Sequence, residues 1–236
     1  MIFGKNENIG FCAKTVSLAF ALAGFAPTLN AQDRSSYPTF MFDLTYGLTT
    51  MKSKLVESND TGSSLNYSLG GFAGSDQQIE YNIGFEKDAA SFQLNDSTIA
   101  YDWQDTKLRY HLGMFYAGLV FTRLNMEMTR AGEDIIDAAG SGYGGTLGFL
   151  TDIGKRGMFR IDVTSVSLPK LKNVIAGEAA VPSRLDIDIG ASIDLYGKWS
   201  NFNFGYRMRT IGVKADVSAS DTESSTYIGF RIMTKR

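Results

Sequence analysis

The chain has 236 residues, a formal net charge of −2 and a single cysteine. Its length suits one domain of roughly 200 residues once a leader is removed. A nearly balanced charge without a Lys/Arg-rich run gives no reason to expect a nucleic-acid partner. With one histidine and one cysteine, neither a disulfide framework nor a thiolate or histidine metal site is expected. The sequence therefore predicts no cofactor and no metal.

The N-terminal segment has the three parts of a secretory signal peptide. Lys5 and Lys14 give the start of the chain a positive charge. The apolar stretch 16–26 follows, and Ala31 provides a small residue for cleavage. Ala26 is a second possible cleavage point. A membrane anchor is the alternative, but the apolar stretch has only about 11 residues, whereas a helix needs about 20 to span the hydrocarbon.

The sequence is accordingly divided into a signal peptide, residues 1–31, and one β-barrel domain, residues 32–236. The only cysteine, Cys12, falls in the leader. Beyond the leader no segment approaches 18 consecutive apolar residues, the length expected of a transmembrane helix. If the remaining chain lies in a membrane, it must therefore be a closed barrel, because only helices and barrels satisfy every backbone polar group in lipid.

Alternation of apolar and polar residues runs through the barrel domain. In 184–195 every odd position from Leu185 to Leu195 is apolar, and the even positions are polar or small. A strand separates these two sets onto opposite faces, whereas a helix would mix them. Gln104-Asp105 indicates either a bulge or a turn within one of the strands. Ten strands are predicted, at about 37–50, 63–73, 77–87, 97–112, 115–128, 141–152, 157–168, 184–195, 199–214 and 223–234.

The predicted connections alternate between short and long. The short ones are 74–76, 113–114, 153–156 and 197–198, and the long ones are 51–62, 88–96, 129–140, 169–183 and 215–222. Short periplasmic turns opposite longer outer loops are typical of outer-membrane barrels. An even number of strands also places both ends of the barrel on the periplasmic side.

With its signal peptide, glycine-rich alternating strands and loop rhythm, the chain resembles the small bacterial outer-membrane barrels of the OmpA-barrel, OmpX and OmpW type. Residues 109–119, Arg-Tyr-His-Leu-Gly-Met-Phe-Tyr-Ala-Gly-Leu, are similar to a strand–turn–strand element of those proteins. The chain departs from them in ending Met-Thr-Lys-Arg at 233–236 rather than in an aromatic residue. The resemblance implies an antiparallel up-and-down transmembrane β-barrel in the bacterial outer membrane. Its implied partners are outer-membrane lipids, including lipopolysaccharide, and the barrel-assembly machinery.

In a membrane barrel the apolar set faces lipid and the polar set fills the interior. A Gly197-Lys198 turn would place Asp188 opposite Arg207, Asp186 opposite Arg209, and Tyr196 opposite Trp199. Arginine outnumbers lysine on the polar set, which favours paired, buried charge over a wetted surface. The residues predicted to form ion pairs in the interior are Asp162, Asp186, Asp188, Asp194, Arg160, Arg184, Arg207 and Arg209.

Aromatic residues near two of the predicted turns indicate a girdle at the membrane–water interface. Ordinary β-propensity of aromatic residues is the alternative. The residues predicted for this girdle are Tyr110, Phe115, Tyr116, Tyr196 and Trp199.

No catalytic residue is predicted. His111 is the only histidine, has no serine within two residues and lies on the polar set, so a hydrogen-bonding role inside the barrel is expected. Asp186 and Asp188 share a face but have arginine partners, which favours structural pairs over a catalytic dyad. The sequence therefore predicts a non-enzymatic barrel with a charged, largely filled interior and a structural or surface-interaction role through 129–140 and 169–183. A narrow channel for small solutes and a soluble periplasmic binding barrel are the alternatives.

Overall fold

The computed structural model describes residues 37–54, 58–74, 78–88, 92–94, 96–153, 156–168, 171–172, 179–196, 200–214 and 218–234. The predicted signal peptide lies outside these residues. Within them, no helix has the length and apolar character needed to cross a membrane.

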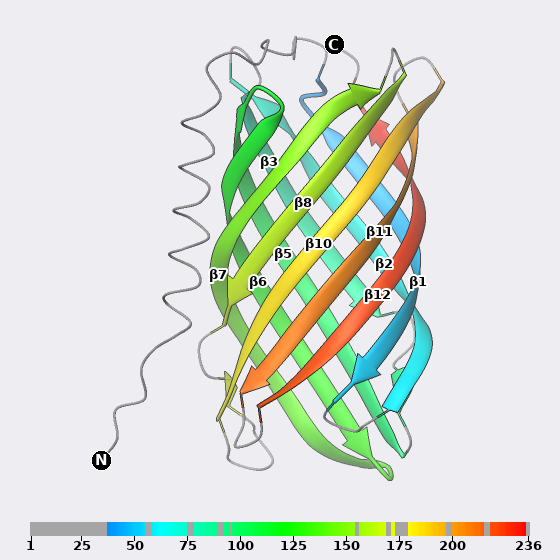
Figure 1. The fold of residues 1–236 in the computed structure, drawn as a ribbon, viewed down its shortest axis with the longest axis vertical. Coiled ribbons are helices and arrows are strands. Elements are labelled where there is room, and N and C mark those ends of the chain that lie inside the picture. The colour runs from blue at the N-terminus through cyan, green and yellow to red at the C-terminus, as the bar shows by residue number, and fades with distance from the viewer. Residues whose placement is uncertain are drawn as a thin grey trace, which may run out of the picture.

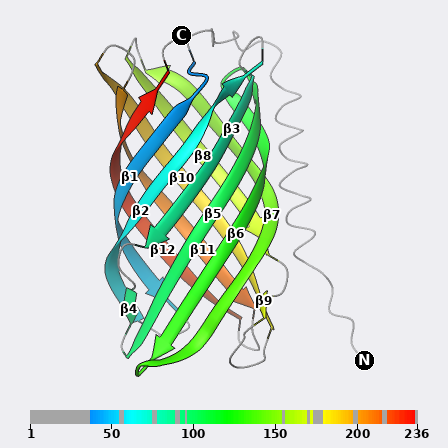
Figure 2. The ribbon, with the colours of Figure 1, turned by 180° about the vertical axis from the view of Figure 1, so that it is seen from behind.

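The described part of the chain forms a closed antiparallel barrel (Figures 1 and 2). Each long strand pairs with the next, and β12 returns to pair with β1, so the sheet has no open edge along the wall. The ten long strands are β1 (Met41–Ser53), β2 (Ser58–Ala73), β3 (Ile79–Asp88), β5 (Ser97–Leu112), β6 (Phe115–Arg130), β7 (Glu133–Ile153), β8 (Gly157–Ser167), β10 (Ala179–Tyr196), β11 (Ser200–Lys214) and β12 (Ser218–Met233). Two short strands, β4 (Phe92–Leu94) and β9 (Leu171–Lys172), pair with β5 and β10. The predicted up-and-down barrel of about ten strands is confirmed.

The barrel has two distinct ends. Met41 at the start of β1 pairs with Met233 at the end of β12, so both ends of the barrel chain lie together. This end, which we call the terminal end, also carries the tight turn at 113–114 between β5 and β6. It is the upper end in Figure 1. The opposite end, which we call the far end, carries the connections that the sequence predicts to be long.

At the far end, three predicted long loops prove to be mostly strand. β6 continues to Arg130 and β7 begins at Glu133, so the expected loop 129–140 is reduced to a turn at Ala131 and Gly132. Both turn residues have positive φ, 52° and 84°, as a tight type I′ hairpin turn requires. The expected loops 51–62 and 215–222 are likewise mostly strand. Sequence missed these extensions because their acidic and small residues have little β-propensity of their own, and pairing with the neighbouring strand supplies the order.

The apolar face of the wall changes sides partway along β5. Towards the terminal end, Leu108, Tyr110 and Leu112 point outward and are exposed. Towards the far end, the outward positions carry polar groups such as Asp102, and the apolar side chains Ile99, Tyr101 and Trp103 are buried inside. The strand itself is continuous, because Gln104 and Asp105 pair in unbroken register with Arg123 and Thr122. Neither the bulge nor the turn suggested for Gln104-Asp105 exists.

The same exchange occurs on the neighbouring strand, β6. Its outward positions are Phe115, Leu119 and Phe121 towards the terminal end, and then Arg123, Asn125 and Glu127 towards the far end. Its inward positions change from mixed to apolar at the same level, with Leu124, Met126 and Met128 buried. Because side chains alternate strictly across a strand, this exchange reflects a change in the surroundings of the wall and not a change of register. The terminal part of the wall therefore presents apolar side chains outward, and the far part presents polar ones.

Candidate functional site: the barrel interior

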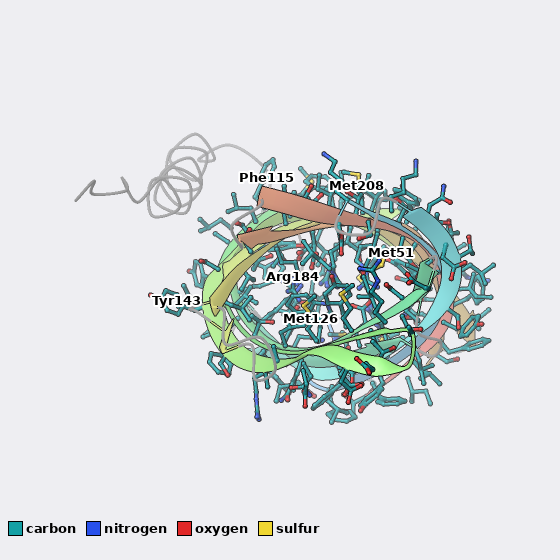
Figure 3. The ribbon with its side chains drawn as sticks, turned by 90° about the horizontal axis from the view of Figure 1, so that it is seen from below. Met51, Phe115, Met126, Tyr143, Arg184 and Met208 are labelled. Carbon is teal, nitrogen blue, oxygen red and sulfur yellow. The ribbon has the colours of Figure 1, made fainter. Side chains whose placement is uncertain are left out.

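The interior of the barrel has three layers, which are apolar at the far end, charged in the middle and apolar again at the terminal end. Figure 3 looks into the far end, where Met51, Met126 and Arg184 point inside the wall and Phe115, Tyr143 and Met208 point away from it. The far cluster contains Met51, Ile99, Tyr101, Trp103, Val120, Leu124, Met126, Met128, Ala138, Val166, Leu168 and Ile211. The terminal cluster contains Tyr37, Met41, Phe72, Tyr116, Leu150 and Met233, with Met158 packed against it.

The far cluster fills the barrel as a hydrophobic core fills a soluble domain. Ile99, Tyr101, Leu124 and Ile211 come from β5, β6 and β11, and each is completely buried. Water outside the wall and apolar side chains inside it are the arrangement that the hydrophobic effect favours for this part of the chain. The cluster therefore stabilises the far end of the barrel.

The segment that precedes β1 packs against the terminal end of the barrel. The Tyr37 ring packs against the Phe72 ring with centroids 4.8 Å apart, and both side chains are buried. The Phe72 amide donates to the Pro38 carbonyl at 3.0 Å, and the Tyr81 hydroxyl donates to the Thr39 carbonyl at 2.7 Å. Residues 38–40 thus continue β1 along the wall between β2 and β12, and the Tyr37 ring packs into the terminal cluster.

Arg209 on β11 is the centre of the charged layer. Its guanidinium bonds three carboxylates, which are Glu86 at 2.6 Å, Asp186 at 2.9 Å and Glu223 at 3.2 Å. Arg207, two residues earlier on the same face, bonds the other oxygen of Glu86 at 2.6 Å. Strands β3, β10, β11 and β12 are thereby joined across the lumen as well as along the wall.

Arg184 on β10 reaches across to β5. It donates to Asp105 at 2.6 Å, and its guanidinium lies 4.4 Å from the centre of the Trp103 ring. The Thr122 hydroxyl donates to the other oxygen of Asp105 at 2.6 Å. This contact set marks the floor of the charged layer, where the far cluster begins.

A second network lies nearer the terminal end and centres on Glu80 of β3. Arg109 and Arg160 bond one oxygen of Glu80 at 2.9 and 2.7 Å, and His111 Nε2 is 2.8 Å from the other. Arg109 also bonds Asp162 at 2.6 Å. His111 is therefore a partner in an ion network and has the hydrogen-bonding role predicted from its position.

The remaining charged pairs lie between these two networks. Arg231 of β12 bonds Asp43 of β1 at 2.6 Å, across the seam where the barrel closes. Asp188 accepts a hydrogen bond from Tyr227 at 2.7 Å. Between them is a cavity of about 230 Å³, lined by charged, amide and hydroxyl side chains and by apolar ones such as Phe85, Leu150 and Met158.

The structure places the predicted interior ion-pair residues on the inner face of the wall. Asp186 lies opposite Arg209 and Asp188 opposite Arg207, in the register predicted from the sequence. Asp186 forms a salt bridge with Arg209. Arg207 instead forms its salt bridge with Glu86, and Asp188 accepts a hydrogen bond from Tyr227. Arg160, Asp162 and Arg184 find partners on distant strands, and Asp194 has no salt bridge within the described chain.

Several members of the network were not in the predicted set. The bulge or turn expected at Gln104-Asp105 left the facing of Asp105 undetermined. Glu223 is the first residue of the last predicted strand, so its facing was equally undetermined. Glu80 and Glu86 fall on the polar set of their strand, but their partners are 29 to 123 residues away along the chain. Alternation indicates which residues face inward, whereas the pairing across the lumen depends on the closure of the barrel.

The predicted aromatic girdle needs one correction. Tyr110 and Phe115 point outward and are exposed. Tyr116 does not, since it is 3% exposed inside the barrel and donates to Asp162 at 2.8 Å. The alternation from Phe115 puts Tyr116 on the inner face, and the space its ring needs is left by Gly148, where a Cβ would overlap the ring. The Tyr196 side chain and Trp199 lie outside the described residues.

The register at the β10–β11 turn also differs from the prediction. Tyr196 lies opposite Ser200 and not opposite Trp199, because the register shifts between Asp194 and Tyr196. An extra residue on one strand moves the partner by one position and leaves the pairs deeper in the barrel unchanged. The Asp188–Arg207 and Asp186–Arg209 registers are therefore unaffected.

The interior offers little that could serve as a reactive centre. Its histidine is bonded to Glu80, and its carboxylates bond guanidinium or hydroxyl groups. Within the described chain no group of three or more His, Cys, Asp or Glu side chains is placed to hold a metal ion. The buried charges bond one another, as desolvated ions must.

Fold and interior together define a transmembrane β-barrel, with an exposed apolar belt outside and paired charges inside.

No family model and no curated protein matches the sequence. Among solved structures, the chain is similar to Neisserial surface protein A, at 12% identity and a TM-score of 0.42, covering 85% of this chain and 100% of that one. It is also similar to the β domain of the Bordetella autotransporter BrkA, at 10% identity and a TM-score of 0.46, with the same coverage. A third similar structure is the outer membrane protein AlkL, at 12% identity, a TM-score of 0.40 and coverage of 89% and 95%.

Proposed function

We propose that the protein is a non-enzymatic barrel of the bacterial outer membrane whose interior is closed, and that it serves as a rigid anchor presenting its far end outside the cell. One observation carries the proposal, namely that the charged layer lies between two clusters of buried apolar side chains, one towards each end of the barrel. Ions and polar solutes cannot cross side chains packed without water, so the resting barrel provides no conducting path.

The outward face supports the membrane location. Leu119, Ile228 and Phe230 are more than half exposed, and they belong to a belt that continues around the terminal part of the wall. Exposed apolar patches of this extent mark an interaction with lipid or protein. The soluble periplasmic barrel, the alternative from sequence, would leave this belt in water. Outer-membrane lipids and the barrel-assembly machinery are the partners that this location implies.

Single-channel recording tests the closed interior. The wild-type barrel, folded into a planar bilayer, is expected to show no discrete conductance steps. Tyr101→Ala and Phe72→Ala, which thin the far and terminal clusters, are each expected to remain silent because the other cluster still closes the lumen. The double variant is expected to conduct. A gel that distinguishes folded from heat-unfolded barrel controls for folding.

Discrete openings of the wild-type barrel would contradict the proposal and favour the narrow channel. In that case the charged layer would set its selectivity, and Arg207→Ala would change the conductance.

A further inference from the structure

The outer boundary of the membrane can be placed on the wall from its outward side chains. Phe121 on β6 and Tyr143 on β7 lie directly opposite each other and are the last large outward side chains of the belt on these strands. Tyr143 is 76% exposed, which suits a ring with an apolar body and a polar tip at the level of the lipid headgroups. The next outward position on β6, Arg123, is therefore the first on the water side of the belt.

Arg123 is unlike the arginines of the interior. It is exposed, and no hydrogen bond or ion pair joins it to another described residue. Its direct neighbours are neutral, with Gln104 opposite it on β5 and Ser141 opposite it on β7. The nearest outward carboxylate, Asp102, is a diagonal neighbour that lies opposite Asn125 and makes no salt bridge with Arg123. The Arg123 guanidinium is thus available to a ligand. It lies beside the Gln104 amide and the Ser141 hydroxyl, one outward position beyond the Phe121 ring.

We propose that Arg123 binds a phosphate group of the lipid in the outer leaflet, with Gln104 and Ser141 as neutral hydrogen-bonding neighbours and Tyr143 at the headgroup level. The proposal rests on the outer-membrane location given under the proposed function. A guanidinium fork matches the oxygens of a phosphate in a bidentate manner. The apolar belt on the terminal side of Arg123 would contact the acyl chains of a lipid. The phosphate of the same lipid would then lie at the level of the guanidinium.

This contact would also fix the height of the barrel in the membrane. Everything on β5 and β6 beyond Gln104 and Arg123 would then stand in water, which agrees with the polar outward residues and the buried apolar interior of that part. The lipid surface and the far cluster thus meet the wall at the same level.

The test measures binding of a bisphosphorylated lipid A and its dephosphorylated form to the folded chain by native mass spectrometry. Arg123→Gln removes the charge and keeps a polar side chain of similar length. Arg156→Gln is the matched control, because Arg156 is also exposed and has no salt bridge within the described chain, but it lies in a turn at the terminal end. Arg123→Lys keeps the charge without the fork.

We expect Arg123→Gln to weaken binding of the phosphorylated lipid about fivefold, the effect of one basic residue near an anionic surface. Arg156→Gln and the dephosphorylated lipid should show no such change, and Arg123→Lys should fall between. Equal binding by wild type and Arg123→Gln would overturn the proposal, as would an equal loss in Arg156→Gln. The same preparations are recorded in planar bilayers, so a failure of the lipid contact is distinguished from a failure of the closed barrel.

Discussion

Arg209→Leu is expected to destabilise the barrel strongly, so that it unfolds at a much lower urea concentration than the wild type. The substitution removes the guanidinium that Glu86, Asp186 and Glu223 share, and Glu223 has no other salt bridge within the described chain. Breaking a buried ion pair by deleting one partner typically costs about 3–5 kcal/mol, because the remaining charge stays buried without compensation. Typical domains have a stability of roughly 5–15 kcal/mol, so this loss is a large fraction of the total.

The measurement is urea unfolding of the barrel in lipid vesicles, followed by the change in mobility between folded and unfolded chain on a gel. Arg130→Leu is the control, since Arg130 forms an exposed pair with Asp96, with side-chain exposures of 62% and 56%. Exposed pairs contribute about 0–1 kcal/mol. If both variants unfolded at the same urea concentration as the wild type, the charged layer would not be what holds the strands together across the lumen.

Leu119→Arg is expected to destabilise the barrel although Leu119 is 70% exposed. In a soluble protein a charge at such a position would be tolerated. Here the side chain faces the hydrocarbon, and an arginine on the lipid face near the bilayer midplane costs about 2–4 kcal/mol. The matched control is Asn125→Arg, on the same face of the same strand but beyond the belt, where we expect almost no change.

Both variants are folded into vesicles, and their unfolding free energies are compared with that of the wild type. A loss confined to Leu119→Arg supports the lipid-facing belt. Equal stability of the two variants would mean that the whole outer face of β6 meets water.

Much of this fold could be predicted from the sequence because a strand has a period of two residues. The segment 184–195 alternates without interruption, which identified the strand, its inward face and its register against β11. Charged residues at the inward positions could likewise be recognised as an interior set. These features depend only on neighbours along the chain or across one hairpin.

Other features could not be predicted from alternation, because the face that carries the apolar residues changes partway along a strand. On β5 the apolar residues occupy odd positions up to Trp103 and even positions from Leu108, which resembles a bulge if a single surrounding medium is assumed. Pairing across the lumen is equally hidden, since Arg209 and Glu86 are separated by 123 residues. Tyr116 was misplaced because aromatic residues near a turn suit both an interface and an interior with space for a ring.

A thiol-accessibility scan along β6 tests the central claim of a membrane barrel with a closed interior and a protruding far end. The chain from Gln32 onward has no cysteine, so single cysteines can be placed at 119, 121, 124, 125, 126 and 127. In nanodiscs, a water-soluble maleimide should label 125 and 127 rapidly, and 124 and 126 hardly at all. Cysteines at 119 and 121 should resist this reagent. When they are labelled with a fluorophore before folding, a quencher dissolved in the lipid should reduce the fluorescence of that label. Rapid aqueous labelling at 119 and 121, equal to that at 125, would contradict the account.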